Sequence, residues 1–240
     1  MGVRRAQIAG MLLVLAGAAA AGMADEPQYV WRDGQWVEVQ PPEPGTPAAK
    51  IQTLRELLRQ GNYGDVVDAA ETFIEQHPRT PLREEAYNLA AQAQFERGHY
   101  YQAYHWYERQ ITHFPNGPLL DRALDREMAV AEKFLAGEKR IVLRVFRLPA
   151  QDEALDILLG VAEHAPGTER AQAALLRIAR YRYEKQQWLE AAQAYDDFLA
   201  TFPKSDRATH AMLQAAHASY RAYEGPAHDA TPLIDAEQRF

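Results

Sequence analysis

Four prolines that close predicted helices recur along the chain and set its register. They lie 37, 51 and 37 residues apart, and in three units a helix break precedes the closing proline by 17 residues. The closing prolines are Pro78, Pro115, Pro166 and Pro203, and the three breaks are Gly61, Gly98 and Gln186. Because proline and glycine interrupt helices, this spacing predicts pairs of helices repeated along the chain.

Residues 83–115 show one repeat most clearly. Its first predicted helix carries Tyr87 and ends at Gly98, and its second carries Ala103 and ends before Pro115. A large aromatic residue, a small packing residue and a closing proline are typical of tetratricopeptide repeats. Since these features recur in the other units, the sequence predicts an all-α fold. We expect a right-handed superhelix of about five tetratricopeptide-like helix pairs over residues 48–240.

The third unit departs from this spacing. From Gly137 to Pro166 the distance is 29 residues instead of 17, which indicates an insertion at 138–149. This stretch contains four basic residues and one acidic residue among apolar ones. Two interpretations stay open. The stretch is an exposed basic and apolar element that binds a partner or an anionic membrane, or it prolongs a helix or packs across the repeat junction with its arginines solvated.

Residues 1–24 have the features of a secretory signal peptide. Arg4 and Arg5 precede an apolar run of about 14 residues, which is shorter than the roughly 20 residues that span a bilayer. Small residues follow, and they fit cleavage after Ala24 or Ala21. We therefore expect export to the periplasm, with or without association with the outer membrane.

Residues 25–47 precede the repeats as a separate segment. An Asp-Gly turn at 33–34 predicts a short β-hairpin in which Trp31 lies opposite Trp36. A lone hairpin is marginally stable, so we expect it to dock on the first helices, with an aromatic clamp for a ligand such as a glycan as the alternative. The proline-rich stretch 41–47 is interpreted as a stiff linker.

The composition and the motifs of the chain exclude several classes of function. The chain has 33 acidic and 26 basic residues, a net charge of −7 that argues against nucleic-acid binding. It has no cysteine, which excludes disulfides, thiolate metal sites and lipid attachment at a cysteine. No nucleophile elbow, phosphate-binding loop or zinc-helix motif is present, and paired acids such as Glu84-Glu85 are interpreted as solvated. The sequence therefore predicts a non-enzymatic protein without a cofactor or a metal.

Candidate partner-binding residues lie on the first helices of two units and in the insertion. First helices line the binding surface of such repeats, and polar residues one turn apart there are placed to hydrogen-bond an extended peptide. Counting back from the closing prolines gives Glu85, Asn88, Gln92 and Phe95 in the second unit, and Arg180 and Tyr183 in the fourth. The insertion adds Arg144 and Phe146.

Residues 98–115 and 188–205, together with the end of the chain at 229–240, resemble the BamD (YfiO) family of outer-membrane assembly factors. The similarity covers roughly residues 47–240. The resemblance implies a periplasmic scaffold of the β-barrel assembly machinery. Its expected partners are outer-membrane assembly subunits or unfolded outer-membrane proteins, with peripheral membrane association also open.

Two other functions stay open on the sequence. One is a scaffold that coordinates cell division with the envelope, similar to CpoB, although residues 25–47 show no coiled-coil heptads. The other is the repeat region of a lytic transglycosylase whose catalytic domain would follow Phe240. We expect a chain truncated at Phe240, because the last predicted helix ends there without a closing proline; a short capping helix is the alternative.

Overall fold

The computed structural model describes residues 28–32, 34–39, 41–142, 146–223, 225 and 229–239 of the 240-residue chain. The predicted signal peptide and Arg144 lie outside these residues. The chain divides into two compact units, Met1–Pro42 and Glu43–Phe240. None of the described helices is long and apolar enough to cross a membrane.

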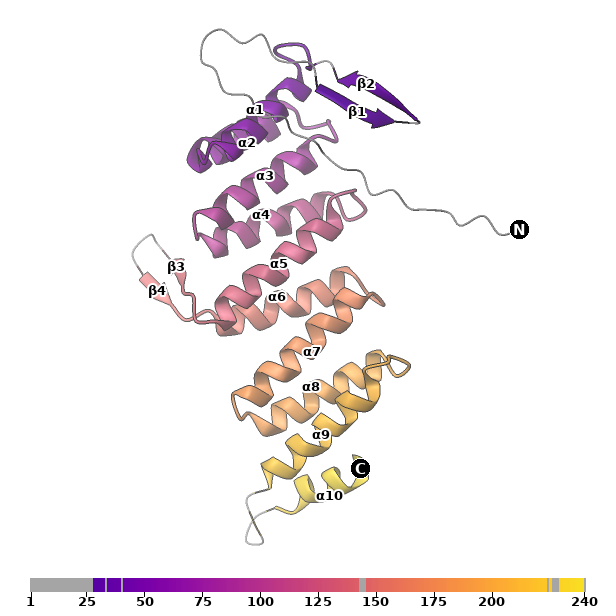
Figure 1. Cartoon of the computed structure of the whole chain (residues 1–240). Helices are drawn as coiled ribbons and strands as arrows, with labels where there is room; N and C mark the ends of the chain where they lie inside the picture. The colour runs from indigo at the N-terminus through magenta and orange to yellow at the C-terminus, as the bar shows by residue number, and fades with distance from the viewer. Residues whose placement is uncertain are drawn as a thin grey trace, which may run out of the picture. The chain divides into compact units, whose positions relative to one another are not determined.

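The first unit contains a β-hairpin made of β1 (Gln28–Arg32) and β2 (Gln35–Val39) (Figure 1). The strands are antiparallel, and Trp31 lies opposite Trp36, as the sequence predicted. The two indole rings meet edge to face with centroids 5.3 Å apart, a favourable geometry for an aromatic pair. Both side chains remain more than half exposed. Docking of this hairpin on the first helices stays a prediction.

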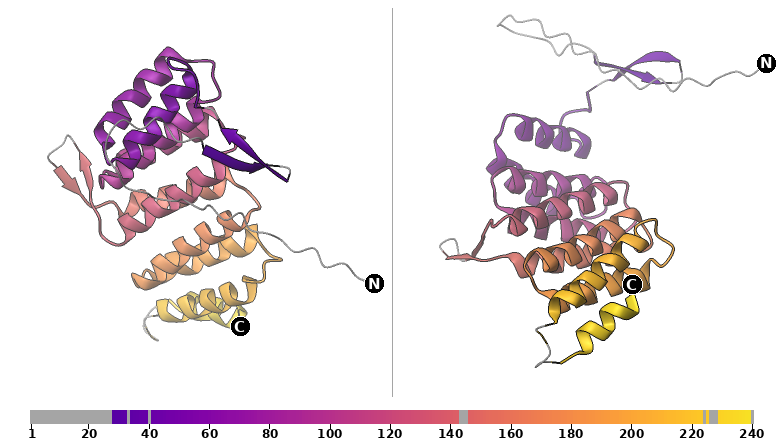
Figure 2. Two further views of the ribbon diagram at one scale, coloured as in Figure 1. Left: turned by 45° about the horizontal axis from the view of Figure 1, so that its top comes forward. Right: turned by 60° about the horizontal axis from the view of Figure 1, so that its bottom comes forward.

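The second unit is built mainly of helices, which lie in five pairs along its described residues (Figures 1 and 2). The pairs are α1 (Pro47–Arg59) with α2 (Tyr63–Gln76), α3 (Arg83–Glu96) with α4 (Tyr100–His113), α5 (Leu120–Leu135) with α6 (Gln151–His164), α7 (Glu169–Glu184) with α8 (Trp188–Thr201), and α9 (Ala208–Ala222) with α10 (Thr231–Arg239). Each helix contacts the next along the chain, so each pair packs on the following one. The predicted all-α architecture of five helix pairs is confirmed.

The turns inside the α1–α2, α3–α4 and α7–α8 pairs are made at Gly61, Gly98 and Gln186, each with a left-handed backbone. After α3, Gly98 has a φ of 74°, and the N–H of His99 donates to the carbonyl of Gln94 at 2.9 Å, which closes the helix end. Gln186 takes the corresponding place after α7 with a φ of 58°. This conformation is unfavourable for a residue with a Cβ atom. The predicted breaks at both positions are confirmed.

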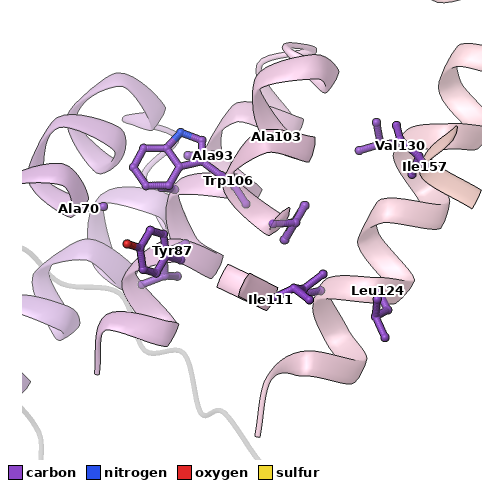
Figure 3. Packing of buried hydrophobic residues seen from close by; sticks show 14 of the residues in the cluster. Ala70, Tyr87, Ala93, Ala103, Trp106, Ile111, Leu124, Val130 and Ile157 are labelled. Atoms are coloured by element: carbon purple, nitrogen blue, oxygen red, sulfur yellow. The ribbon is translucent and has the colours of Figure 1, made fainter. Parts of the chain in front are cut away.

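Small residues let neighbouring helices approach, and aromatic rings fill the space between them. Figure 3 shows Ala70, Ala93 and Ala103 in one buried cluster with Tyr87 and Trp106, whose ring centroids lie 5.9 Å apart. This cluster extends from α1 to α7, and a second cluster joins α7, α8 and α9. The core is therefore extended along the chain, with neighbouring pairs sharing side chains.

The insertion at 138–149 is a second β-hairpin, which corrects the expectation of helix throughout the repeat region. β3 (Arg140–Val142) pairs antiparallel with β4 (Phe146–Leu148). The interpretation as a prolonged helix overlooked the β-branched and aromatic residues of this stretch, which favour strands. The hairpin lies between α5 and α6 and extends from the helices (Figure 1).

Candidate partner-binding surfaces

Seven of the eight residues predicted to bind a partner belong to the described part of the chain, and they lie in two parts of the fold. Six are on first helices: Glu85, Asn88, Gln92 and Phe95 on α3, and Arg180 and Tyr183 on α7. The seventh, Phe146, is exposed on β4. The first surface, called here the first-helix side, is formed by α1, α3, α5 and α7, and the second is the β3–β4 hairpin.

Asn88 is buried, which corrects its assignment to the surface. Its side chain is 2% exposed, and its Nδ2 donates a hydrogen bond to Oε1 of Gln110 at 3.0 Å. Gln110 in turn donates from Nε2 to the carbonyl of Leu119 at 3.2 Å. Helix α3 contacts α1, α2 and α4, so most of its circumference is buried and spacing alone could not identify its free face. Asn88 therefore joins α3 to α4 and, through Gln110, to the start of α5.

Glu84 forms a second buried polar contact at the same place. Its Oε1 accepts a hydrogen bond from the backbone N–H of Leu119 at 2.8 Å, so Glu84 is not the solvated residue expected from the sequence. The contact satisfies one of the N–H groups that have no partner inside α5. Gly117 lies against this carboxylate, and a Cβ atom at Gly117 would overlap it.

Phe95 and Tyr183 each stand before the break of their helix pair and pack on the aromatic residue after it. The ring centroid of Phe95 lies 5.1 Å from that of Tyr100, and Tyr183 lies at the same distance from Trp188, both edge to face. Both rings are half-buried among apolar neighbours. Phe95 and Tyr183 therefore pack between the two helices of their pair, and only part of each ring is accessible to a partner.

Glu85 and Gln92 lie on the first-helix side, where they contact neighbouring repeats. Arg55 of α1 donates from Nε to Oε1 of Glu85 at 2.5 Å and from Nη2 to Oε2 at 2.8 Å. This hydrogen-bonded pair raises the pKa of the Arg55 guanidinium. Gln92 accepts a hydrogen bond from Arg122 of α5 at 3.5 Å. These side chains therefore already have partners within the stack.

Two arginines of α7 continue these links. Arg170 contacts Oδ1 of Asp125 at 2.5 Å and Oδ1 of Asp121 at 2.9 Å, and Arg177 contacts Oε1 of Glu132 at 2.6 Å. The carboxylates are largely exposed, and such pairs each contribute less than about 1 kcal/mol to stability.

Arg180 is exposed, one turn beyond Arg177 on the same helix. Among the described residues no carboxylate lies within ion-pair distance of its guanidinium. Among the predicted residues on the first-helix side, Arg180 is thus the one whose side chain is most available to a partner.

A buried acid between the repeats escaped sequence reasoning. Glu127 of α5 is fully buried, and neither of its carboxylate oxygens has a hydrogen-bond donor. Burial raises the pKa of Glu127 well above its usual range, and the neighbouring Glu108 of α4 raises it further. Nε2 of His164 on α6 lies 3.6 Å from Oε1 of Glu108. A protonated Glu127 can therefore donate a hydrogen bond to Glu108.

A cleft of about 460 Å³ lies between α1 and α2. Apolar side chains from both helices form part of its lining, including Leu54, Leu57 and Phe73, and Lys50 and Asp68 also line it. None of these residues was predicted to bind a partner. Within the second unit, no described helix pair precedes α1 and α2 to pack on this surface.

Within the described ranges, no three His, Asp or Glu side chains are grouped so that they could hold a metal ion. The expectation that the protein is not an enzyme and needs no cofactor stays a prediction.

No protein-family model matches the chain, and no curated protein matches it. Among solved structures, the chain is similar to nearly identical tetratricopeptide-like repeats of a Podosopora anserina kinesin light chain. The identity is 15%, the match covers 81% of this chain and 96% of the other, and the TM-score is 0.38. A single-substitution variant of those repeats gives 16% identity over 80% of this chain and 91% of the other, with a TM-score of 0.36. The fold assignment rests on the helix pairs of the chain itself.

Proposed function

We propose that this protein is a non-enzymatic scaffold that binds other proteins through its stacked helix pairs. The observation that carries the proposal is the repetition of five similar helix pairs in one continuous stack. Such a stack presents a long surface on which an extended partner can contact several repeats in turn. Arg180 on the first-helix side and Phe146 on the β3–β4 hairpin are its exposed contacts.

The finer proposal is a role in the assembly of outer-membrane β-barrel proteins in the periplasm. Its support is the signal-peptide pattern of residues 1–24 and the resemblance of residues 98–115 and 188–205 to the BamD family. Partners would then be subunits of the assembly machinery or unfolded outer-membrane proteins. Both contain extended segments that suit a surface made of repeats.

Crosslinking in cells tests this function. A photoreactive amino acid is placed at Arg180 or at Phe146, with the exposed loop residue Arg79 as the matched control position. We expect covalent capture of an outer-membrane β-barrel protein from Arg180 or Phe146 and not from Arg79. Recovery of the protein alone from periplasmic extracts, with no captured protein at either position, would contradict the proposal.

Cell fractionation tests the location separately. We expect the mature protein in the periplasmic or outer-membrane fraction, with an N-terminus at Gly22 or Asp25 by mass spectrometry, because cleavage after Ala21 or Ala24 fits the small-residue rule. An intact Met1 in the cytoplasmic fraction would show that residues 1–24 are not an export signal.

A further inference from the structure

The base of the β3–β4 hairpin is fixed to the helices by Arg140. Its Nη1 lies 2.6 Å from Oε1 of Glu153 on α6, and its guanidinium lies 5.7 Å from the ring centroid of Tyr101 on α4. Strand β3 also contacts α4. One arginine thus joins the hairpin to two helices, so the hairpin is anchored at β3.

Strand β4 is exposed along its whole length. Phe146 is 58% exposed and Leu148 is 40% exposed, and Arg147 between them is exposed as well. Residues two apart on a strand lie on the same face, so Phe146 and Leu148 form an apolar pair with Arg147 on the opposite face. Two adjacent, exposed apolar side chains on a held strand are typical of a contact surface.

The backbone of β4 has a free edge as well. Within the described residues the sheet has two strands, and β4 pairs with β3 alone. Its other edge therefore carries N–H and C=O groups without a strand partner, which is the arrangement that binds an added strand.

The charge of strand β4 differs from that of the chain. The whole chain carries a net charge of −7, whereas β4 carries one exposed base, Arg147, and no acid. Lys139 and Glu138, both exposed next to β3, offset each other. In the part of the chain that the structure describes, no carboxylate lies within ion-pair distance of Arg147. A basic strand on an acidic protein favours an acidic partner segment.

We propose that β4 binds an extended acidic segment of a protein partner, which adds to its free edge as a third strand. Apolar residues of the segment lie beside Phe146 and Leu148, and an acidic residue lies beside Arg147. The proposal deepens the proposed scaffold function and rests on it only in that the partner is a protein. The bound segment is a strand of alternating apolar and acidic residues, and it lies outside the helix pairs.

A charge-swap experiment tests the proposal on the full chain. The probes are two fluorescent seven-residue peptides, one alternating Glu with Val and the other alternating Lys with Val. We expect the acidic peptide to bind the wild type, and Arg147→Glu to weaken that binding about fivefold while it strengthens binding of the basic peptide. Arg79→Glu makes the same change of net charge in an exposed loop and should leave both affinities unchanged. Equal affinity of the acidic peptide for the wild type and Arg147→Glu would overturn the proposal.

A second pair of variants tests the apolar contact. Phe146→Ser should lower the affinity of the protein for the acidic peptide. Leu189→Ser changes a residue of α8 that is 63% exposed and should leave this affinity unchanged. If Phe146→Ser instead abolishes binding to anionic lipid vesicles and leaves peptide affinity unchanged, the hairpin is a membrane contact and the proposal is wrong. If it abolishes dimerisation in sedimentation experiments and leaves peptide affinity unchanged, the occupant is a second copy of this chain, which also overturns it.

Crosslinking separates failure of this inference from failure of the proposed function. Capture of an outer-membrane protein from Arg180, without peptide binding at β4, would support the scaffold function and contradict only the proposal of strand addition. Peptide binding at β4 without capture at any position retains the strand-binding site and removes the assembly role.

Discussion

The side chain of Asn88 donates a hydrogen bond to Oε1 of Gln110 at 3.0 Å between α3 and α4, where both residues are buried. We expect Asn88→Ala to lower the free energy of unfolding by about 1–3 kcal/mol, because it leaves a buried amide oxygen without its donor. Urea denaturation measures this loss. Gln92→Ala, one turn away and only partly buried, should change stability by less than about 0.5 kcal/mol. Equal losses in the two variants would contradict the buried role of Asn88.

Gly117 and Glu84 should be energetically coupled. A Cβ atom at Gly117 overlaps the Glu84 carboxylate, so Gly117→Ala must displace it from the N–H of Leu119. We expect Gly117→Ala to cost about 1–3 kcal/mol of stability in the wild type. In a Glu84→Ala background the same change should cost much less, because the overlapping group is gone. Thermal unfolding of the four proteins measures the coupling, and additive effects would disprove it.

Glu127 should make stability depend on pH in a defined direction. Its pKa is raised in the folded protein above the ordinary value of 4.5, so the folded state binds its proton more tightly than the unfolded state does. Its stabilising contribution is therefore complete below about pH 4.5 and is lost as pH rises through the raised pKa. The titratable groups that face it are Glu108, Tyr104 and Tyr107 on α4, and His164 on α6 lies beside Glu108.

Glu127→Gln removes this dependence, because a neutral amide donates to Glu108 at every pH. We expect the variant to be more stable than the wild type at pH 7.5 by about 1–3 kcal/mol, with the difference shrinking as pH falls toward 5. Urea denaturation across this pH range gives the curve. Glu163→Gln, at an exposed position of α6, serves as the control and should follow the wild type. A variant less stable than the wild type at pH 7.5 would rule out this view of Glu127.

Gln186→Gly should stabilise the protein. Gln186 has a φ of 58°, a backbone conformation that glycine adopts without a steric cost. The gain is limited to about 0.5–1 kcal/mol, because glycine also gives the unfolded chain more conformational freedom. The preceding residue, Lys185, has an ordinary φ of −83°, so Lys185→Gly should destabilise. Thermal unfolding compares the two variants, and a loss in Gln186→Gly would refute the argument.

Local backbone requirements made the helix pairs predictable from the sequence. The break at Gly98 and the closing Pro115 act within a few residues, so their effect does not depend on the rest of the fold. The pairing of Trp31 with Trp36 was predictable for the same reason, because a two-residue turn fixes the register of its strands. The β3–β4 hairpin was not predicted, because the predicted helices on both sides led to the expectation that residues 138–149 are helical too.

The binding surface was harder to predict, because burial depends on contacts between repeats. Asn88 and Gln92 stand one turn apart on α3 and look equivalent in the sequence, yet only Asn88 meets Gln110 of the next helix. Glu127 did carry a signal that sequence reasoning left unused. It lies on one helix face with Leu124 and Ala131, both fully buried, which indicates that its carboxyl group is buried too.

The two larger clusters of buried side chains meet at α7, which in the described part of the chain is the one helix that contributes to both. A third, smaller cluster joins α8 and α9. Ala174 belongs to the cluster of the earlier helices, and Ala179 belongs to the cluster of α8 and α9. In repeat proteins each helix pair is stabilised only by contacts with the adjacent pairs. Helices that share a cluster of buried side chains are therefore expected to unfold together. We therefore expect the stack to unfold as two cooperative blocks that share α7. Opening of the later block alone is then expected to expose the amides of α8 and α9 to hydrogen exchange while those of α1 to α6 stay protected.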